Sequence, residues 1–301
     1  MVLKILKFIL RLLNPLRWYS ALRFSSNQSK KERVEYDPQL KLYSEILGNE
    51  CLHYGYFEDT ELSGGEISLS HFRDAQRRYS EILIDHVKSG PALDVGCGMG
   101  SLLTDLENRG ITAKGLTPDE AQVQYIRENK PDFSVIHDRY EDLDTKQYVD
   151  HFHTVLNSES LQYIELEKAF QVTQDILAPD GRWIICDYFR RQENTHEESG
   201  HLLERFRDLL EDSEWSVNTE RDITPNILGT LKFAYTMADR IGLSLLNFLD
   251  KKFSTKYPVV YDFSREEMNT LKDQTTSEMK TIDPEQFKND KTYRLYVLER
   301  N

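Results

Sequence analysis

Short apolar runs alternate with amphipathic segments through the middle of the chain. The apolar runs have the length of buried strands, and the segments between them repeat apolar residues at helical spacing. This alternation predicts a parallel sheet that helices cover on both faces. The predicted strands are residues 92–95, 113–116, 133–136, 152–156 and 183–186, and the predicted helices between them are 102–109, 120–129 and 166–177.

The segments on either side of this region are mainly helical in pattern. The predicted elements are helices at 36–47, 69–87 and 197–211, a strand at 215–219, a long helical stretch at 227–253, a helix at 265–272 and a final strand at 293–298. The interval before the last strand is too long for a plain connection, so it predicts a lid or substrate-binding subdomain.

These patterns divide the chain into five parts. They are a basic amphipathic N-terminal segment (1–33), an N-terminal helical cap (34–90), a core (91–222), a helical lid or substrate subdomain (223–290) and the last strand of the core (291–301). A chain of 301 residues is long enough to bury a core of this size.

Charge is distributed unevenly along the chain. The net charge is −13, but residues 1–33 carry +7, which leaves −20 for the remainder. A body this acidic would repel a phosphate backbone, so nucleic acid is excluded as an expected partner. Three cysteines are too few for a disulfide framework or a zinc site, so no metal is expected and the cytoplasm is the predicted location.

Residues 1–24 have a basic amphipathic pattern. Lys4, Lys7 and Arg11 share one helical face, and leucines occupy another. Pro15 ends the apolar run, so the segment is too short and too charged to span a bilayer. Two interpretations stay open: the helix lies on an anionic membrane surface and gives peripheral contact, or it packs its apolar face on the protein.

A strand, a glycine loop and a helix follow one another at Asp94. The loop reads Asp94-Val95-Gly96-Cys97-Gly98-Met99-Gly100. Its glycines allow the backbone to approach a ligand, and the helix start offers N–H groups to a carboxylate. A nicotinamide loop needs a third glycine where Ser101 stands. An acid ahead of the loop pairs with a cationic amine, so the pattern favours S-adenosylmethionine.

These motifs resemble the core of a class I S-adenosylmethionine-dependent methyltransferase. The nearest subgroup holds cyclopropane-fatty-acid synthases, tocopherol methyltransferases and isoprenoid C-methyltransferases. The resemblance implies a Rossmann-like α/β fold with a seven-stranded sheet, N-terminal helices and a helical lid before an antiparallel last strand. It also implies S-adenosylmethionine as cofactor, bound by His53, Asp94, Gly96, Cys97, Gly98, Gly100, Thr117, Gln122, Asp138, Tyr140 and Asn157.

Two shorter motifs support this set. Thr117 and Gln122 match a Thr-x-Ser-x-x-Gln pattern, which implies hydrogen bonds to the ribose and methionine portions of the cofactor. Asp119 stands at the serine position, where it suits a helix N-cap. Asp138 and Tyr140 follow the third predicted strand, where the family contacts adenine.

Candidate catalytic residues are Glu159, Tyr54 and Tyr56. Glu159 resembles the acid of a Glu-Ser pair in the family and suits a general base or a stabiliser of a cationic intermediate. The alternative is a carboxylate that holds the Tyr54 loop by hydrogen bonds. Residues 53–57 resemble an aromatic loop that closes over the cofactor, and the alternative is an aromatic cluster that packs the N-terminal helices. His201 and Arg205, expected on the helix after the fifth strand, are weaker candidates.

Cyclopropanation is disfavoured by three departures from the family pattern. The shared motifs place Tyr54, Gln162 and Cys186 where cyclopropane synthases hold bicarbonate with a cysteine, a glutamate and a histidine. Ordinary methyl transfer is therefore expected.

The expected acceptor is a small hydrophobic molecule that is lipid, isoprenoid or quinone-like, because residues 223–290 are rich in aromatic and aliphatic side chains. Three alternatives stay open: an N- or O-methyltransferase of a polar metabolite, a nicotinamide oxidoreductase, and a non-catalytic membrane adaptor on the same fold. The sequence leaves the oligomeric state open.

Overall fold

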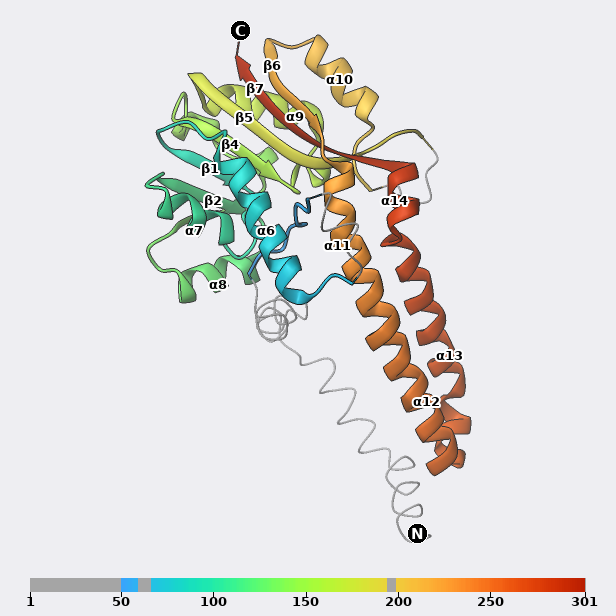
Figure 1. Ribbon diagram of the computed structural model, residues 1–301. Helices are drawn as coiled ribbons and strands as arrows, with labels where there is room; N and C mark the ends of the chain where they lie inside the picture. The colour runs from blue at the N-terminus through green and yellow to red at the C-terminus, as the bar shows by residue number, and fades with distance from the viewer. Residues whose placement is uncertain (1–49, 59–65, 194–198, 301) are drawn as a thin grey trace.

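A seven-stranded sheet forms the centre of the molecule (Figure 1). The computed structural model describes residues 50–58, 66–193 and 199–300. The strand order is β3-β2-β1-β4-β5-β7-β6, and β7 runs antiparallel to both of its neighbours. This arrangement confirms the predicted Rossmann-like methyltransferase sheet with its antiparallel last strand.

The strands have the following bounds: β1 Ala92–Val95, β2 Ala113–Thr117, β3 Ser134–His137, β4 Phe152–Ser158, β5 Leu177–Arg190, β6 Trp215–Asp222 and β7 Lys291–Arg300. Each predicted strand is present. β5 is much longer than its apolar stretch, 183–186, because its ladder with β7 continues from Arg182 to Arg190 and Leu177 at its start pairs with Phe152 of β4. Hydrogen bonding along the ladder, and not hydrophobicity, therefore sets its length.

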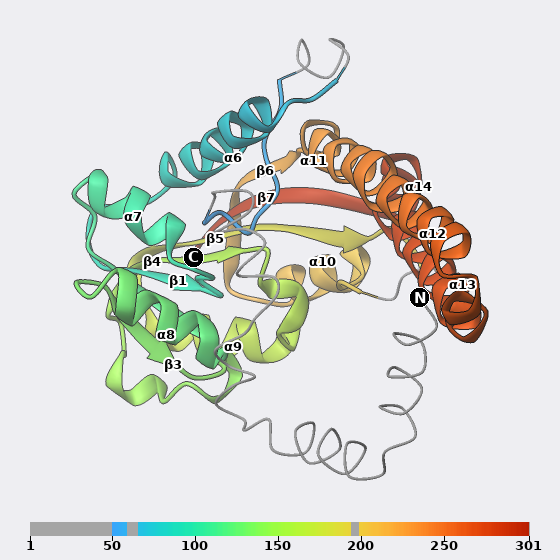
Figure 2. The same cartoon turned by 90° about the horizontal axis from the view of Figure 1, so that it is seen from below.

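Helices cover both faces of the sheet (Figure 2). Those of the core are α6 Leu69–Ile84, α7 Ser101–Asn108, α8 Glu120–Asn129, α9 Leu166–Ile176 and α10 Leu203–Glu211. One apolar cluster lies between the sheet and α9 and α10, around Trp183 and Phe206. A second lies on the opposite face under α6, α7 and α11, and includes Tyr79 and Tyr293.

The insertion before the last strand is wholly helical. It consists of α11 Thr224–Met237, the π-helical η5 Ala238–Leu243, α12 Ser244–Lys256, α13 Pro258–Thr281 and α14 Pro284–Asp290. α13 greatly exceeds the predicted helix 265–272. In Figure 1 the stretch from α11 to α13 projects beyond the sheet as an elongated hairpin, which we call the arm.

The predicted first residue of the helix at 197–211 was wrong. α10 begins at Leu203. Gly200 has a left-handed backbone, with φ of +89°, and a Cβ there would lie 2.8 Å from the Tyr188 ring. A right-handed helix cannot include this residue in that conformation.

Several expectations fall outside the described residues. These are the N-terminal segment 1–33, the helix at 36–47 and the first part of the 197–211 helix. In the part of the chain that is described, none of the helices combines the length and the apolar character needed to cross a bilayer.

Candidate functional site

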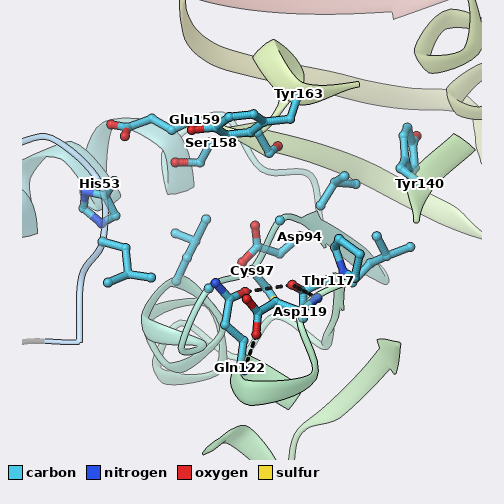
Figure 3. Close-up of a pocket in the computed structure, with 18 of the residues that line it drawn as sticks. His53, Asp94, Cys97, Thr117, Asp119, Gln122, Tyr140, Ser158, Glu159 and Tyr163 are labelled. Atoms are coloured by element: carbon cyan, nitrogen blue, oxygen red, sulfur yellow. Dashed lines mark hydrogen bonds between the residues drawn. The ribbon is translucent and has the colours of Figure 1, made fainter. Parts of the chain in front are cut away.

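A cavity of about 570 Å³ lies at the carboxyl ends of β1, β2 and β4. Its volume falls within the range of small-molecule sites, and this edge of a parallel sheet is where ligands bind in such folds. In Figure 3, Ser158, Glu159 and Tyr163 stand on one wall, Thr117, Asp119 and Gln122 stand on the opposite wall, and Asp94 lies between them.

The glycine loop after β1 forms the floor of the cavity. Gly96 has φ of +77°, and a Cβ there would lie 2.5 Å from the Ser160 Cβ. Gly98 and Cys97 also line the cavity. Gly100 does not line it but is the N-cap of α7, with φ of +75° and no side-chain cap. The uncapped start of α7 therefore offers backbone N–H groups to an anionic ligand.

Asp94 is the most deeply buried acid in the cavity, with 2% of its surface exposed. No hydrogen bond from a described residue reaches its carboxylate, and burial raises its pKa to about 7. A buried carboxylate without a partner is costly, and an ammonium group is the partner that relieves this cost. The cavity therefore fits the amino end of S-adenosylmethionine.

Thr117, at the end of β2, and Gln122, in the first turn of α8, lie together on one wall of the cavity. The Thr117 hydroxyl donates to Gln122 Oε1 at 2.7 Å. Asp119 Oδ1 accepts from the N–H groups of Ala121 and Gln122, which confirms it as the N-cap of α8. No described residue accepts from the Gln122 amide nitrogen, so its N–H groups remain for a ligand.

Of the two candidate adenine contacts, only Tyr140 lines the cavity. Its ring is buried, and its hydroxyl bonds to Thr173 Oγ1 at 2.7 Å. Asp138 lies outside the lining and accepts from the N–H of Arg139. The neighbours Arg139 and Glu141 line the cavity in its place.

Asn157 is buried beneath the cavity and does not line it. Its Nδ2 donates to Ser160 Oγ at 2.9 Å, and its Oδ1 accepts from Trp183 Nε1 at 2.8 Å. The structure thus places this residue as a support for the loop after β4, not as a ligand contact.

Glu159 lines the reacting end of the cavity in a strained backbone conformation. Its φ is +56°, and its N–H donates to the Cys186 carbonyl at 2.9 Å. Non-glycine residues in this region are uncommon and gather at functional sites. Glu159 Oε1 accepts from the Tyr54 N–H at 2.6 Å and from the Tyr293 hydroxyl at 2.7 Å. Burial raises its pKa to about 7, and these two hydrogen bonds partly oppose that rise.

His53 lines the cavity as a neutral imidazole. Its Nδ1 donates to the Tyr54 carbonyl at 2.8 Å, and its ring stacks on Tyr79 with centroids 4.6 Å apart. Burial lowers its pKa to about 4. His53 therefore contributes a hydrogen-bonding group to the cavity but no positive charge.

Tyr54 and Tyr56 are absent from the lining of the cavity, so their catalytic role stays a prediction. The Tyr54 ring packs against Tyr293 at 5.6 Å, and the Tyr56 hydroxyl accepts from Arg221 at 3.2 Å. Tyr54 approaches the site through its backbone N–H to Glu159. The aromatic loop is thus joined to β7 through Tyr54 and to β6 through Tyr56.

His201 and Arg205 also lie away from the cavity. His201 precedes α10 and donates through Nε2 to the carbonyls of Leu161 and Ile164, at 3.0 and 2.8 Å. The Arg205 guanidinium pairs with Glu167 at the surface.

Gln162 is a lining residue that the sequence indicated only as a departure from the cyclopropane-synthase pattern. Its Nε2 donates to the Glu159 carbonyl at 3.3 Å, and its backbone N–H donates to Asp187 Oδ2 at 3.1 Å. Its Oε1 is buried and has no partner among the described residues. The polar run after the apolar β4 was the signal that could have found it.

The described residues of the insertion contribute nothing to the lining. A lid role for residues 223–290 stays a prediction. The described residues also hold no group of three or more His, Cys, Asp or Glu side chains placed to bind a metal ion.

Comparisons with known proteins agree with this fold. Residues 92–181 match a family model described as a methyltransferase domain. No curated protein sequence matches the chain. The solved structures that resemble it include the cyclase SpnF (17% identity, 87% of this chain and 92% of that one, TM-score 0.62).

Two further similar structures are a C-methyltransferase and a cyclopropane synthase. Geranyl diphosphate C-methyltransferase from Streptomyces coelicolor A3(2) is 16% identical, with 88% of this chain and 99% of that one covered and a TM-score of 0.60. The cyclopropane synthase MmaA2 from Mycobacterium tuberculosis is 11% identical, with 88% and 95% covered and a TM-score of 0.60.

The family match covers the segment that holds the glycine loop, Asp94 and Glu159. The solved structures share the overall fold of this chain, in which the cavity lies beside the glycine loop. Residues 92–181 therefore form a methyltransferase domain in a class I methyltransferase fold, with S-adenosylmethionine as its cofactor.

Proposed function

We propose that the protein methylates a small, mainly apolar acceptor whose reacting end carries a hydroxyl or amine and whose body carries no phosphate. The observation that carries this proposal is the buried Gln162 Oε1, which has no partner among the described residues and lies near the Glu159 carboxylate in the lining of the cavity. A buried hydrogen-bond acceptor needs a donor, so the molecule that is methylated supplies one.

The proposed cofactor position rests on three groups without hydrogen-bond partners among the described residues: the Asp94 carboxylate, the first N–H groups of α7 and the Gln122 amide nitrogen. Asp94 would pair with the cofactor's ammonium group, the start of α7 would face its carboxylate, and Gln122 would hydrogen-bond its hydroxyl groups. Tyr140 would lie against the base. Bound there, S-adenosylmethionine supplies an electrophilic methyl group on a sulfonium.

Glu159 then acts on the acceptor's proton. The acceptor's oxygen or nitrogen forms a bond to the methyl carbon as the bond between that carbon and sulfur breaks, and Glu159 takes the proton released. A pKa of about 7 suits this role, because a base near the working pH combines the correct protonation state with driving force. Positioning by the cavity supplies much of the remaining rate.

The charges of the lining argue against a phosphate-bearing acceptor. The lining carboxylates are Glu50, Asp94, Asp119, Glu141 and Glu159. Among the described residues, Arg139 is the only Lys or Arg in the lining, and its Nη2 is 3.0 Å from Glu141 Oε1. A diphosphate would meet repulsion here. Geranyl diphosphate, which occurs in the Streptomyces coelicolor complex, is thus a poor match for this cavity.

Apolar side chains support an acceptor with an apolar body. Leu52, Met99, Leu102 and Ile164 line the cavity beside the polar groups. The second candidate is a polar metabolite with a cationic amine, which the excess of carboxylates favours. The proposed location is the cytoplasm, and peripheral membrane contact through residues 1–24 remains part of the proposal.

A labelling experiment tests the proposed function. Purified protein is given S-adenosylmethionine with a labelled methyl group and a total extract of its own cells, which is then split into organic and aqueous phases. Label in the organic phase that falls at least about tenfold in Glu159→Gln supports the proposal. The matched control is Glu167→Gln, which alters a surface carboxylate paired with Arg205 and should leave transfer unchanged.

Other results would overturn the proposal in distinct ways. Label confined to the aqueous phase would establish the polar-metabolite candidate. Full activity of Glu159→Gln would remove the proposed base. Absence of transfer by protein that binds S-adenosylmethionine would favour the non-catalytic adaptor.

A further inference from the structure

Exposed apolar side chains are concentrated on the arm. Ten large apolar residues are exposed among those described, and seven of them lie between positions 235 and 271. The seven are Tyr235, Ile241, Leu245, Phe248, Phe253, Tyr257 and Leu271. Such a concentration marks an interaction surface more often than scattered single residues do.

The outer face of α12 has no cover in the described structure. Leu245 and Phe248 are one helical turn apart and are 54% and 58% exposed. Nothing from 238 to 256 is buried. The inner face is held to α13, because Asp250 accepts from the Tyr261 hydroxyl at 2.7 Å and pairs with Lys272 at 2.9 Å. One face of α12 therefore packs on α13, and the opposite face is exposed to solvent among the described residues.

Positive charge accompanies this apolar face. Residues 240–257, here called the arm tip, contain four Lys or Arg and one Asp, which gives +3 in a chain of net charge −13. Lys252 Nζ lies 5.4 Å from the centre of the Phe248 ring, and Lys256 Nζ lies 5.6 Å from that of Tyr257. No described carboxylate pairs with either lysine. Lysines beside aromatic and aliphatic side chains are the composition of a surface that binds anionic lipid.

We propose that the arm tip docks on an anionic lipid bilayer. Leu245 and Phe248 would enter the boundary between headgroups and acyl chains, and Lys251, Lys252 and Lys256 would reach the lipid phosphates. The acidic body would be repelled by the same surface, so the tip is the part that approaches it. Figure 1 shows the tip at the far end of the arm from the sheet, where the body does not obstruct contact.

The proposal is independent of the methyl acceptor, because the described arm does not line the cavity. The full chain is mixed with vesicles of phosphatidylcholine alone or with phosphatidylglycerol added, and the bound fraction is measured by flotation. Wild type should bind only the anionic vesicles, and less at high salt. The double variant Leu245→Asp with Phe248→Asp should bind at least about tenfold less.

The matched control is Val149→Asp with Val217→Asp. It adds the same charge at two exposed apolar residues outside the arm, and it should bind vesicles as wild type does. Binding of S-adenosylmethionine by each variant verifies the fold of the core. Reversal of charge at Lys251, Lys252 and Lys256 should also weaken binding to anionic vesicles.

Four results would overturn the proposal. The first is absence of wild-type binding to either vesicle, and the second is an equal loss in the control. The third is unchanged binding by the arm variant, which would assign the membrane contact to another segment such as residues 1–24. The fourth is a dimer in sedimentation velocity that the arm variant converts to a monomer without any vesicle binding, which would assign the face to a second copy of the chain.

Discussion

The Tyr293 hydroxyl donates to Glu159 Oε1 at 2.7 Å, which joins the last strand of the sheet to the loop after β4. The two residues are 134 positions apart in the chain. Tyr293 also exchanges a hydrogen bond with the Tyr79 hydroxyl at 2.9 Å. A hydrogen bond to the charged form of a carboxyl lowers its pKa, so β7 opposes the effect of burial on Glu159.

Tyr293→Phe should therefore raise the pKa of Glu159. Loss of this donor should move the acid limb of the pH profile of kcat upward by about one pH unit. The same substitution at Tyr296, which also lies on β7 and whose hydroxyl donates to Glu220 of β6, should leave the profile unchanged. Superimposable profiles for Tyr293→Phe and wild type would contradict the role given to Glu159.

Gly96→Ala should destabilise the protein more than Gly110→Ala does. Both glycines have φ near +75°, but a Cβ on Gly96 would overlap Ser160 whereas nothing described lies within 4 Å of one on Gly110. The expected losses in unfolding free energy are about 2–5 kcal/mol at Gly96 and about 1–2 kcal/mol at Gly110. Denaturant titration measures both, and equal losses would show that the loop yields to the added methyl group.

The ligand-free protein should lose stability as the pH rises from 7 to 9. Burial raises the pKa of Asp94 and Glu159 to about 7 and that of Asp187 to about 8. In this window the native state releases protons that the unfolded chain has already lost, so the free energy of unfolding falls. The melting temperature should drop by about 3 °C or more. A melting temperature that rises with pH over this range would contradict these pKa shifts.

The window avoids an opposing contribution from histidine. Burial lowers the pKa of His53 to about 4, so its effect on stability is confined to pH values below its unfolded pKa of about 6.5. Asp94→Asn should reduce the slope of melting temperature against pH, because it removes one of the three carboxyls.

The local order of strand, acid, glycines and helix made the cofactor side of the site predictable from the sequence. Asp94 and Gly96 were predicted from the end of an apolar strand, Thr117 and Gln122 were predicted from the resemblance to a family motif, and all four line the cavity. Their positions depend on short-range pattern, because the carboxyl ends of parallel strands meet at one edge.

The remaining features depend on contacts between distant segments. The sequence predicted Tyr293 only as a residue of the final strand, because nothing near it in the sequence indicates Glu159 as its hydrogen-bond partner. Tyr54 was expected to act at the site, and in the structure its ring packs against Tyr293 while its N–H contacts Glu159. Side-chain direction in an irregular loop is set by such packing and has no periodic signature.

Cofactor binding should depend on the ionisation of Asp94. Its carboxyl must lose a proton to pair with an ammonium group, so affinity for S-adenosylmethionine should weaken as the pH falls below about 7. The loss should approach tenfold for each pH unit below that value. Asp94→Asn should bind with little dependence on pH, and a wild-type affinity that does not change between pH 8 and pH 6 would contradict this pairing.

The most direct test is calorimetric measurement of S-adenosylmethionine binding at pH 8 to wild type, Asp94→Asn and Asp138→Asn. Asp94 lines the cavity and Asp138 does not, so the two variants make the same chemical change inside and outside it. Wild type and Asp138→Asn should bind with equal affinity, and Asp94→Asn should bind at least about tenfold more weakly. Equal binding by Asp94→Asn and wild type would contradict the placement of the cofactor in this cavity.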